Sequence, residues 1–259
     1  MTIKFGPAGL GGVKEAVANL EEFHKLGIKA CEIAFTYEVY IKNQKDIKAI
    51  KEAAKKFGIE LSIHSQYWVN LNSEDKDKLE KSKKRILDCC ETGELLGAKL
   101  VVFHPGYYSK KPKQEAYENI KNAILEMQNE IKKKEWKIKI AVETMGKVNV
   151  FGSIEEIKKL IKETGCSFCL DFAHLLARSN GKMSYKEMAE EFKEFDSWHC
   201  HFSGIVYGEK GEKNHKITPK EELEKLIKAL PKNKNITIIN ESPTPVEDSV
   251  MGVKILGGK

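Results

Sequence analysis

Residues 100–106 read LVVFHPG, a short apolar run that stops at a histidine followed by proline and glycine. A continuous apolar run of this length is typical of a strand buried on both faces, as in a parallel sheet. Similar runs rich in β-branched residues recur at residues 3–5, 30–34, 61–64, 138–143, 167–171, 198–202 and 236–241. Together with residues 100–104, they predict eight strands.

Between these runs, apolar residues recur at the spacing of a helix with one buried face, as at Val13, Val17 and Leu20 or at Ile124 and Met127. Eight strand–helix units close naturally into a (β/α)8 barrel, whose typical length of about 250 residues suits this chain of 259 residues. We therefore expect an α/β fold with a single TIM-barrel domain over residues 1–259. A doubly wound sheet with fewer strands is the alternative.

The charge and the termini limit the partners that the chain can have. The sequence carries 44 Lys and Arg against 38 Asp and Glu, a formal net charge of +6, which favours a polyanion only weakly. No apolar run approaches the roughly 18 residues of a membrane span, and the N-terminus lacks the apolar core of a signal peptide. We expect a cytoplasmic protein with no membrane partner.

The six cysteines predict buried thiols rather than a disulfide framework, because they are few for a chain of this length. Cys166 and Cys169 have the spacing of a zinc or redox motif. No second pair with that spacing follows, so we interpret these two residues as structural.

Polar residues gather where the predicted strands end, which is where a TIM barrel builds its active site. They are His64, His104, Glu143, Asp171, His174, His201 and Glu241, and His215 follows the seventh strand. Each alone is more commonly structural, but together they would bury several titratable groups side by side at a high desolvation cost. A cation would offset that cost. Imidazole with carboxylate favours zinc, or less specifically manganese, and two or three ions would suit phosphoryl chemistry.

Motifs around these residues resemble those of a known family over nearly the whole chain. They are His64-Ser65-Gln66-Tyr67-Trp68-Val69-Asn70-Leu71, Phe103-His104-Pro105-Gly106, Val142-Glu143-Thr144 with Gly146, Leu170-Asp171-Phe172-Ala173-His174, His201 and Glu241. In this order the set resembles endonuclease IV, the zinc-dependent apurinic/apyrimidinic endonuclease family of DNA repair, whose fold is a (β/α)8 barrel.

The resemblance implies a ligand set for each of three zinc ions. The first ion would be held by His64, His104 and Glu143; the second by Glu143 as a catalytic bridge with Asp171, His201 and Glu241; the third by His174 and His215. The implied activity is hydrolysis of the phosphodiester 5′ to an abasic site, which leaves a 3′-hydroxyl and a 5′-deoxyribose phosphate.

The resemblance also implies the partner, double-stranded DNA with abasic sites, and we expect a monomer. Tyr67 and Trp68 fall where the family pushes side chains into the duplex beside the damaged nucleotide, and packing under the loop is their alternative role. Basic residues near these loops, such as Lys110 and Arg178, would contact phosphates, although solvated surface lysines are equally common.

Three departures mark a divergent member of this family. The chain has Gly6-Pro7-Ala8-Gly9 where the family has a Gly-x-His-x-Ser element, and Ser203-Gly204 where Asn-Asp is expected. The third metal site would take an Asp at the position of Lys213, two residues before His215. Glu212, displaced by one residue, could supply the carboxylate if this segment bulges.

Two other functions stay open from the sequence. Sugar isomerases and epimerases of the xylose-isomerase-like barrels place Glu, Asp and His around one divalent metal, but they need fewer histidines. A DNA-binding barrel that has lost part of its metal cluster is the third alternative, because Lys213 interrupts the expected third site. Fold alone decides between none of these.

Overall fold

The computed structural model describes residues 2–258 and has eight parallel strands that form a nearly closed barrel. The order around the barrel is β1-β10-β7-β6-β5-β4-β3-β2. The strands are β1 (Ile3–Pro7), β2 (Ala30–Ala34), β3 (Glu60–His64), β4 (Leu100–Phe103), β5 (Lys139–Glu143), β6 (Ser167–Asp171), β7 (Ser197–Phe202) and β10 (Asn235–Asn240). The expected TIM barrel is therefore confirmed.

The seam between β1 and β2 closes the barrel through a few backbone contacts. Ala8 forms a parallel bridge with Glu32, and the backbone N–H of Gly9 donates to the Glu32 carbonyl at 2.8 Å. A side chain at Gly6 would place its Cβ only 2.0 Å from the Ala30 carbonyl oxygen, so the seam requires a glycine there.

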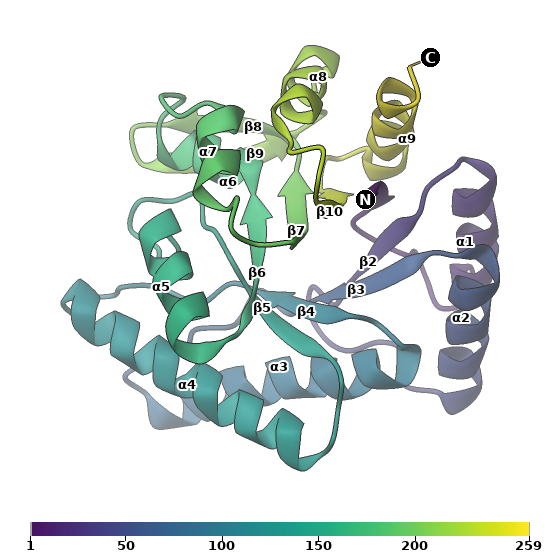
Figure 1. Ribbon diagram of the computed structural model, residues 1–259. Coiled ribbons are helices and arrows are strands. Elements are labelled where there is room, and N and C mark those ends of the chain that lie inside the picture. The colour runs from purple at the N-terminus through teal and green to yellow at the C-terminus, as the bar shows by residue number, and fades with distance from the viewer. Residues whose placement is uncertain (1, 259) are drawn as a thin grey trace.

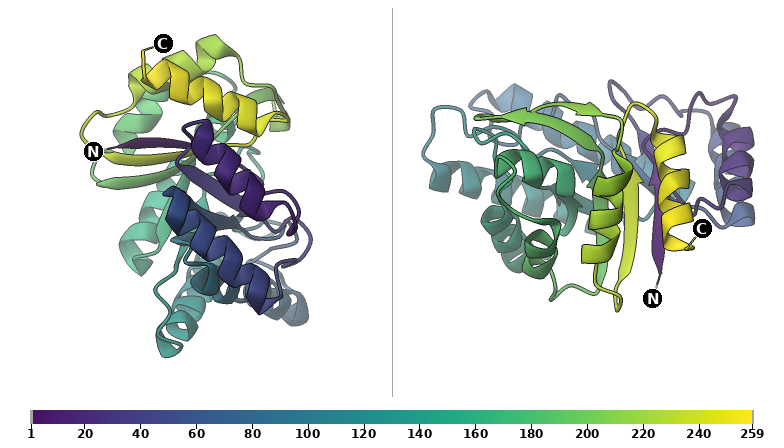
Figure 2. Two further views of the ribbon diagram at one scale, coloured as in Figure 1. Left: turned by 90° about the vertical axis from the view of Figure 1, so that its right-hand side faces the viewer. Right: turned by 90° about the horizontal axis from the view of Figure 1, so that it is seen from above.

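Helices surround the strands on the outside of the barrel (Figures 1 and 2). They are α1 (Ala16–Lys25), α2 (Gln44–Phe57), α3 (Lys76–Leu96), α4 (Lys113–Lys133), α5 (Ile154–Thr164), α6 (Phe172–Arg178), α7 (Tyr185–Glu191), α8 (Lys220–Ala229) and α9 (Pro245–Leu256). Their ends follow local sequence signals. Ser153 and Glu156 form a capping box at the start of α5, and Gly58 ends α2 in the left-handed conformation.

The segment after β7 is folded, although the sequence predicted a loop there. It forms an antiparallel hairpin of β8 (Gly204–Gly208) and β9 (Gly211–Lys216), visible at the upper left of Figure 1. The hairpin is held against the loop after β5, because Glu212 N–H donates to the Gly146 carbonyl at 3.2 Å and Lys147 bridges to Gly211. These tertiary contacts stabilise the hairpin, although the polar sequence of its second strand does not predict a strand.

Alternation along the strands places one set of side chains inside the barrel. Val102, Ala141 and Cys169 pack together there, apart from the larger core between strands and helices. Two residues further along the same strands, the inward positions fall on His104, Glu143 and Asp171. The polar residues thus lie directly above the apolar filling of the barrel.

All six cysteines are buried free thiols, as the sequence predicted. Burial raises the pKa of the Cys166 thiol to about 11, which keeps it protonated at neutral pH. Within residues 2–258, no helix combines the length and the apolar character needed to cross a membrane.

Candidate metal centre

Five groups of described side chains could hold a metal ion, and three of them contain the ligands expected from the sequence. These three groups are His64, His104 and Glu143; Glu143, Asp171, His201 and Glu241; and His174, Glu212 and His215. The other two groups, Cys169 with His199 and His201 and His64 with His201 and Glu241, share His201 with the second of the three. In each group the ligand atoms lie within 4.8 Å of one another.

In the first group two imidazoles face one oxygen of Glu143. His64 Nε2 lies 3.2 Å and His104 Nε2 lies 3.1 Å from Glu143 Oε2. Ligand atoms that bind one tetrahedral zinc ion at about 2.0 Å are separated by about 3.3 Å. The observed separations therefore suit a shared ion.

The second group uses the other oxygen of Glu143. His201 Nδ1 lies 3.3 Å from Glu143 Oε1 and 3.4 Å from Glu241 Oε2. Asp171 is fully buried, and its Oδ2 accepts no hydrogen bond within the described chain but forms an ion pair with His174 Nδ1 at 3.3 Å. A buried carboxylate oxygen without a donor is strongly unfavourable unless a cation lies beside it.

The third group depends on a β-bulge in the hairpin. Val206 pairs with Asn214 and Tyr207 pairs with Glu212, so Lys213 is the extra, unpaired residue. Lys213 is exposed, and Glu212 turns toward His174 with 3.5 Å between its Oε2 and the His174 Nε2. His215 Nε2 lies 4.0 Å from Glu212 Oε1.

Gly146 makes room for the Glu212 carboxylate. A Cβ at this position would lie 2.8 Å from Glu212 Cβ and 3.1 Å from His174 Cδ2. The glycine in the motif around Glu143 thus has a steric role in assembling the third group.

Contacts behind the imidazoles select which nitrogen faces the centre. His64 Nδ1 lies 2.8 Å from the Ser65 carbonyl oxygen, and His174 Nδ1 lies 3.0 Å from the Thr144 carbonyl oxygen. A neutral imidazole has one N–H and one lone pair, and a carbonyl can only accept. In both residues, therefore, Nε2 remains as the nitrogen that could bind a metal.

The electrostatics are those of a cation site. Burial alone would raise the pKa of Glu143, but the imidazoles of His104 and His201 hold this pKa well below its usual value. Burial alone would lower the pKa of His64, but Glu143 raises it to about 9. Protons on the imidazoles thus balance the buried carboxylates, and a metal ion would replace those protons.

Sequence reasoning missed Glu32, a fully buried carboxylate on β2. Its Oε1 lies 2.8 Å from His201 Nε2, and its Oε2 lies 2.9 Å from His199 Nε2. His199 is also buried. The available signal was a charged residue in the middle of an apolar strand.

A cavity of about 350 Å³ opens onto the centre. Six of the candidate ligands line it, together with Tyr67 and Tyr107. Tyr67 is 56% exposed, with its ring 5.8 Å from the ring of His104. Trp68 does not line this cavity; its exposed ring lies 6.4 Å from the ring of Tyr37.

Arg178, expected to contact phosphates, is engaged within the protein instead. Its Nη1 donates to the carbonyl oxygens of Lys147 at 2.6 Å and Val150 at 3.0 Å. Because these carbonyl oxygens belong to the loop after β5, the Arg178 guanidinium stabilises that loop.

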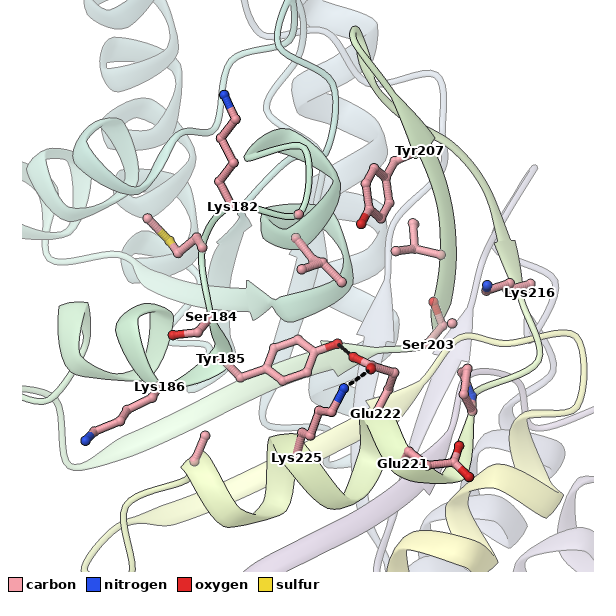
Figure 3. A pocket seen from close by; sticks show the side chains of 17 residues that line it. Lys182, Ser184, Tyr185, Lys186, Ser203, Tyr207, Lys216, Glu221, Glu222 and Lys225 are labelled. Carbon is pink, nitrogen blue, oxygen red and sulfur yellow. Dashed lines mark hydrogen bonds and ion pairs between the residues drawn. The ribbon is translucent and has the colours of Figure 1, made fainter.

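A larger cavity of about 740 Å³ lies between α6, α7, α8 and the hairpin (Figure 3). Tyr185 Oη donates to Glu222 at 2.9 Å, and Lys225 pairs with the same carboxylate at 2.7 Å. The lining contains none of the residues in the three ligand groups. Cavity size therefore does not mark the centre, whereas the convergent ligands do.

The chain belongs to the xylose isomerase-like TIM barrel family, whose model matches residues 20–253. An uncharacterised protein of Methanocaldococcus jannaschii is 31% identical over 96% of this chain and 95% of its own length. A probable endonuclease 4 of Campylobacter concisus is 28% identical over 72% of this chain and 69% of its own length. The chain spans 40% of an apurinic-apyrimidinic endonuclease of Caenorhabditis elegans, at 29% identity over 60% of this chain.

Solved structures share the barrel. Endonuclease IV from Thermus thermophilus superposes with a TM-score of 0.73 at 20% identity, covering 99% of this chain and all (100%) of that one. The structure named SacUVDE has a TM-score of 0.79 at 16% identity and 99% coverage of both chains. A D-tagatose 3-epimerase-like protein has a TM-score of 0.69 at 22% identity, covering 98% of this chain and 96% of that one. At these identities the likeness shows the common fold.

Proposed function

We propose that this protein is a metal-dependent DNA repair endonuclease that hydrolyses the phosphodiester 5′ to an abasic site in double-stranded DNA. The products would be a 3′-hydroxyl and a 5′-deoxyribose phosphate. One observation carries this proposal: three groups of potential ligands lie next to one another, and Glu143 belongs to two of them through separate oxygens. Relatives named as endonuclease 4 and as apurinic-apyrimidinic endonuclease support the substrate class.

The residues divide into roles according to their contacts. Glu143 would bridge two ions, with His64 and His104 on one side and Asp171, His201 and Glu241 on the other. His174, Glu212 and His215 would hold a third. Zinc suits the donor set, and manganese is the alternative. When bound, such ions would activate a water molecule and stabilise the leaving 3′-oxygen.

The rim of the cavity supplies contacts for the nucleic acid. Tyr67 is half-exposed directly above the ligands His64 and His104, with ring centroids 6.1 Å and 5.8 Å away. A planar side chain there can stack on a base beside the gap left by a missing one. Trp68 and Tyr37, which lie further out, would contact the flanking duplex.

Sugar epimerisation is the second candidate, because the second group alone could hold one ion. Glu143 and Glu241 both lie beside His201 Nδ1, so two carboxylates would be available near that ion for proton transfer. Several solved structures of this fold are named as epimerases. This function would leave the remaining imidazoles, His64, His104, His174 and His215, without a role, so we favour the endonuclease.

The deciding experiment offers both substrate classes to the same zinc-loaded preparation. One reaction contains a duplex with a single abasic-site analogue and the matched undamaged duplex, and the other contains ketohexoses. We expect incision only of the damaged duplex and no change in the sugars. Epimerised sugar with intact DNA would replace the proposed function by the alternative.

A further inference from the structure

Glu32 is a buried carboxylate that none of the three ligand groups contains. It lies in the middle of β2, between Cys31 and Ile33, which face the outer core. Within the described chain its ion-pair partners are two imidazoles, those of His199 and His201, rather than any lysine or arginine. Burying a carboxylate in this way is costly, so its retention requires a compensating interaction.

The two oxygens of Glu32 have separate partners. Ser62 Oγ donates to Oε2 at 2.8 Å, and His199 Nε2 lies 2.9 Å from the same oxygen. Oε1 forms an ion pair with His201 Nε2 at 2.8 Å, and neither of these two atoms has a hydrogen-bond partner in the described chain. Ser62 and His199 thus hold the carboxylate so that its free oxygen meets His201.

His201 is oriented differently from the other candidate ligands. His64 turns Nδ1 toward a backbone carbonyl, and His174 turns Nδ1 toward the Thr144 carbonyl as well as toward Glu143 and Asp171. Carboxylates instead face both nitrogens of His201, with Glu143 and Glu241 at Nδ1 and Glu32 at Nε2. Glu143 and Glu241 belong to the second ligand group, so a cation held there would take the Nδ1 lone pair. Glu32 lies outside that group and can only accept, so it would hold the remaining imidazole proton on Nε2.

We propose that Glu32 is a positioning residue that fixes the ring and the tautomer of His201, so that Nδ1 becomes the metal-binding nitrogen of the second group. This inference rests on the metal centre of the proposed function. Glu32 itself touches neither the ions nor the DNA. Outer carboxylates of this kind orient a ligand imidazole and increase its basicity, and their loss commonly weakens metal affinity about 10- to 100-fold.

The test compares zinc retention in the parent and in Glu32→Gln, followed as transfer of zinc to a colorimetric chelator. We expect one ion per chain to be lost at about 10- to 100-fold lower chelator concentration in the variant, with the other ions unaffected. The matched control is Glu60→Gln. Glu60 is also a partly buried carboxylate, but it pairs with Lys4 and Lys99 and belongs to none of the ligand groups. This control should lower the melting temperature without changing zinc retention.

A second measurement reads the tautomer directly. In the zinc-loaded parent labelled with ¹⁵N-histidine, nuclear magnetic resonance should show His201 bound through Nδ1 and carrying a slowly exchanging Nε2–H. That proton should exchange faster in Glu32→Gln. If this variant does not fold, Ser62→Ala, which removes one of the two groups that orient Oε2, should weaken retention of the same ion several-fold.

The outcomes separate this inference from the proposed function. Unchanged zinc retention in Glu32→Gln, or in Ser62→Ala if the first variant does not fold, would overturn the role of Glu32. Coordination of His201 through Nε2 would overturn it as well. In each case, incision by the parent would leave the endonuclease proposal standing. A parent that binds no zinc at all would overturn both.

Discussion

Replacing Glu143 by glutamine should abolish DNA incision while the barrel stays folded. The Glu143 carboxylate is fully buried, and its oxygens lie 3.1–3.3 Å from nitrogens of four imidazoles, those of His64, His104, His174 and His201. An amide is nearly the same size but is neutral, and it presents an NH₂ group in place of one oxygen. One of the two proposed ions would therefore lose a ligand atom, and both ions would lose the negative charge of the carboxylate.

The expected loss of incision rate follows from the metal ions that the two Glu143 oxygens would hold. Charge stabilisation by a correctly placed metal ion is worth several kcal/mol, and a loss of about 4 kcal/mol corresponds to a rate lowered about 1,000-fold. The assay is single-turnover incision of an abasic duplex, with circular dichroism to verify folding. Glu60→Gln makes the same chemical change away from the ligands and should retain incision, and so should His24→Ala on the exposed face of α1. Incision by Glu143→Gln at more than about a tenth of the parent rate would refute the bridging role.

Three further predictions concern the rim, the third group and the pH dependence. Tyr67→Ala should weaken binding to abasic duplex, measured by fluorescence titration, by about 1–3 kcal/mol more than it weakens binding to undamaged duplex. Trp68→Ala should weaken binding to abasic duplex less, because its ring lies outside the cavity. Equal losses on both duplexes would make Tyr67 a packing residue. Glu212→Gln should lower the metal content by elemental analysis from three ions to two, while an unchanged content would remove Glu212 from the centre. Because Glu143 raises the pKa of His64 from 6.5 to about 9 despite burial, the metal-free protein should lose stability as the pH rises from 6.5 to 9. Zinc binds only the deprotonated His64 ring, so the increase in melting temperature on zinc addition should become larger over the same pH interval. An increase that becomes smaller would contradict a protonated His64 in the metal-free protein.

The sequence was sufficient for the barrel and for the strand-end residues because both depend on local patterns. An apolar run such as 100–103 is a strand in almost any parallel sheet, and the carboxyl ends of parallel strands meet at one rim. Alternation then places His104 and Glu143 on the inward side, two residues beyond Val102 and Ala141. The convergence of these side chains therefore needed no knowledge of distant contacts.

The hairpin and Glu32 could not be predicted in the same way, because each depends on residues far away in the chain. The strand Gly211–Lys216 is polar, and its pairing and bulge are stabilised against Gly146 and Lys147. Spacing alone therefore could not decide whether Lys213 or Glu212 would face the centre. Glu32 meets His201 across the barrel, 169 positions away in the sequence (201 − 32), so a single charged residue in a strand gave no sign of its partner.

Incision of an abasic duplex with and without metal removal is the most direct test of the central claim that these ligands form a metal centre for DNA cleavage. The zinc-loaded protein should cut a duplex carrying one abasic-site analogue without added Mg²⁺ and should leave a 3′-hydroxyl at the cut. Brief exposure to EDTA should leave this activity intact, prolonged chelation should abolish it, and added Zn²⁺ should restore it, because buried ligands release their ions slowly. Incision that depends only on added Mg²⁺, or a zinc-loaded protein that leaves the duplex intact, would contradict the claim.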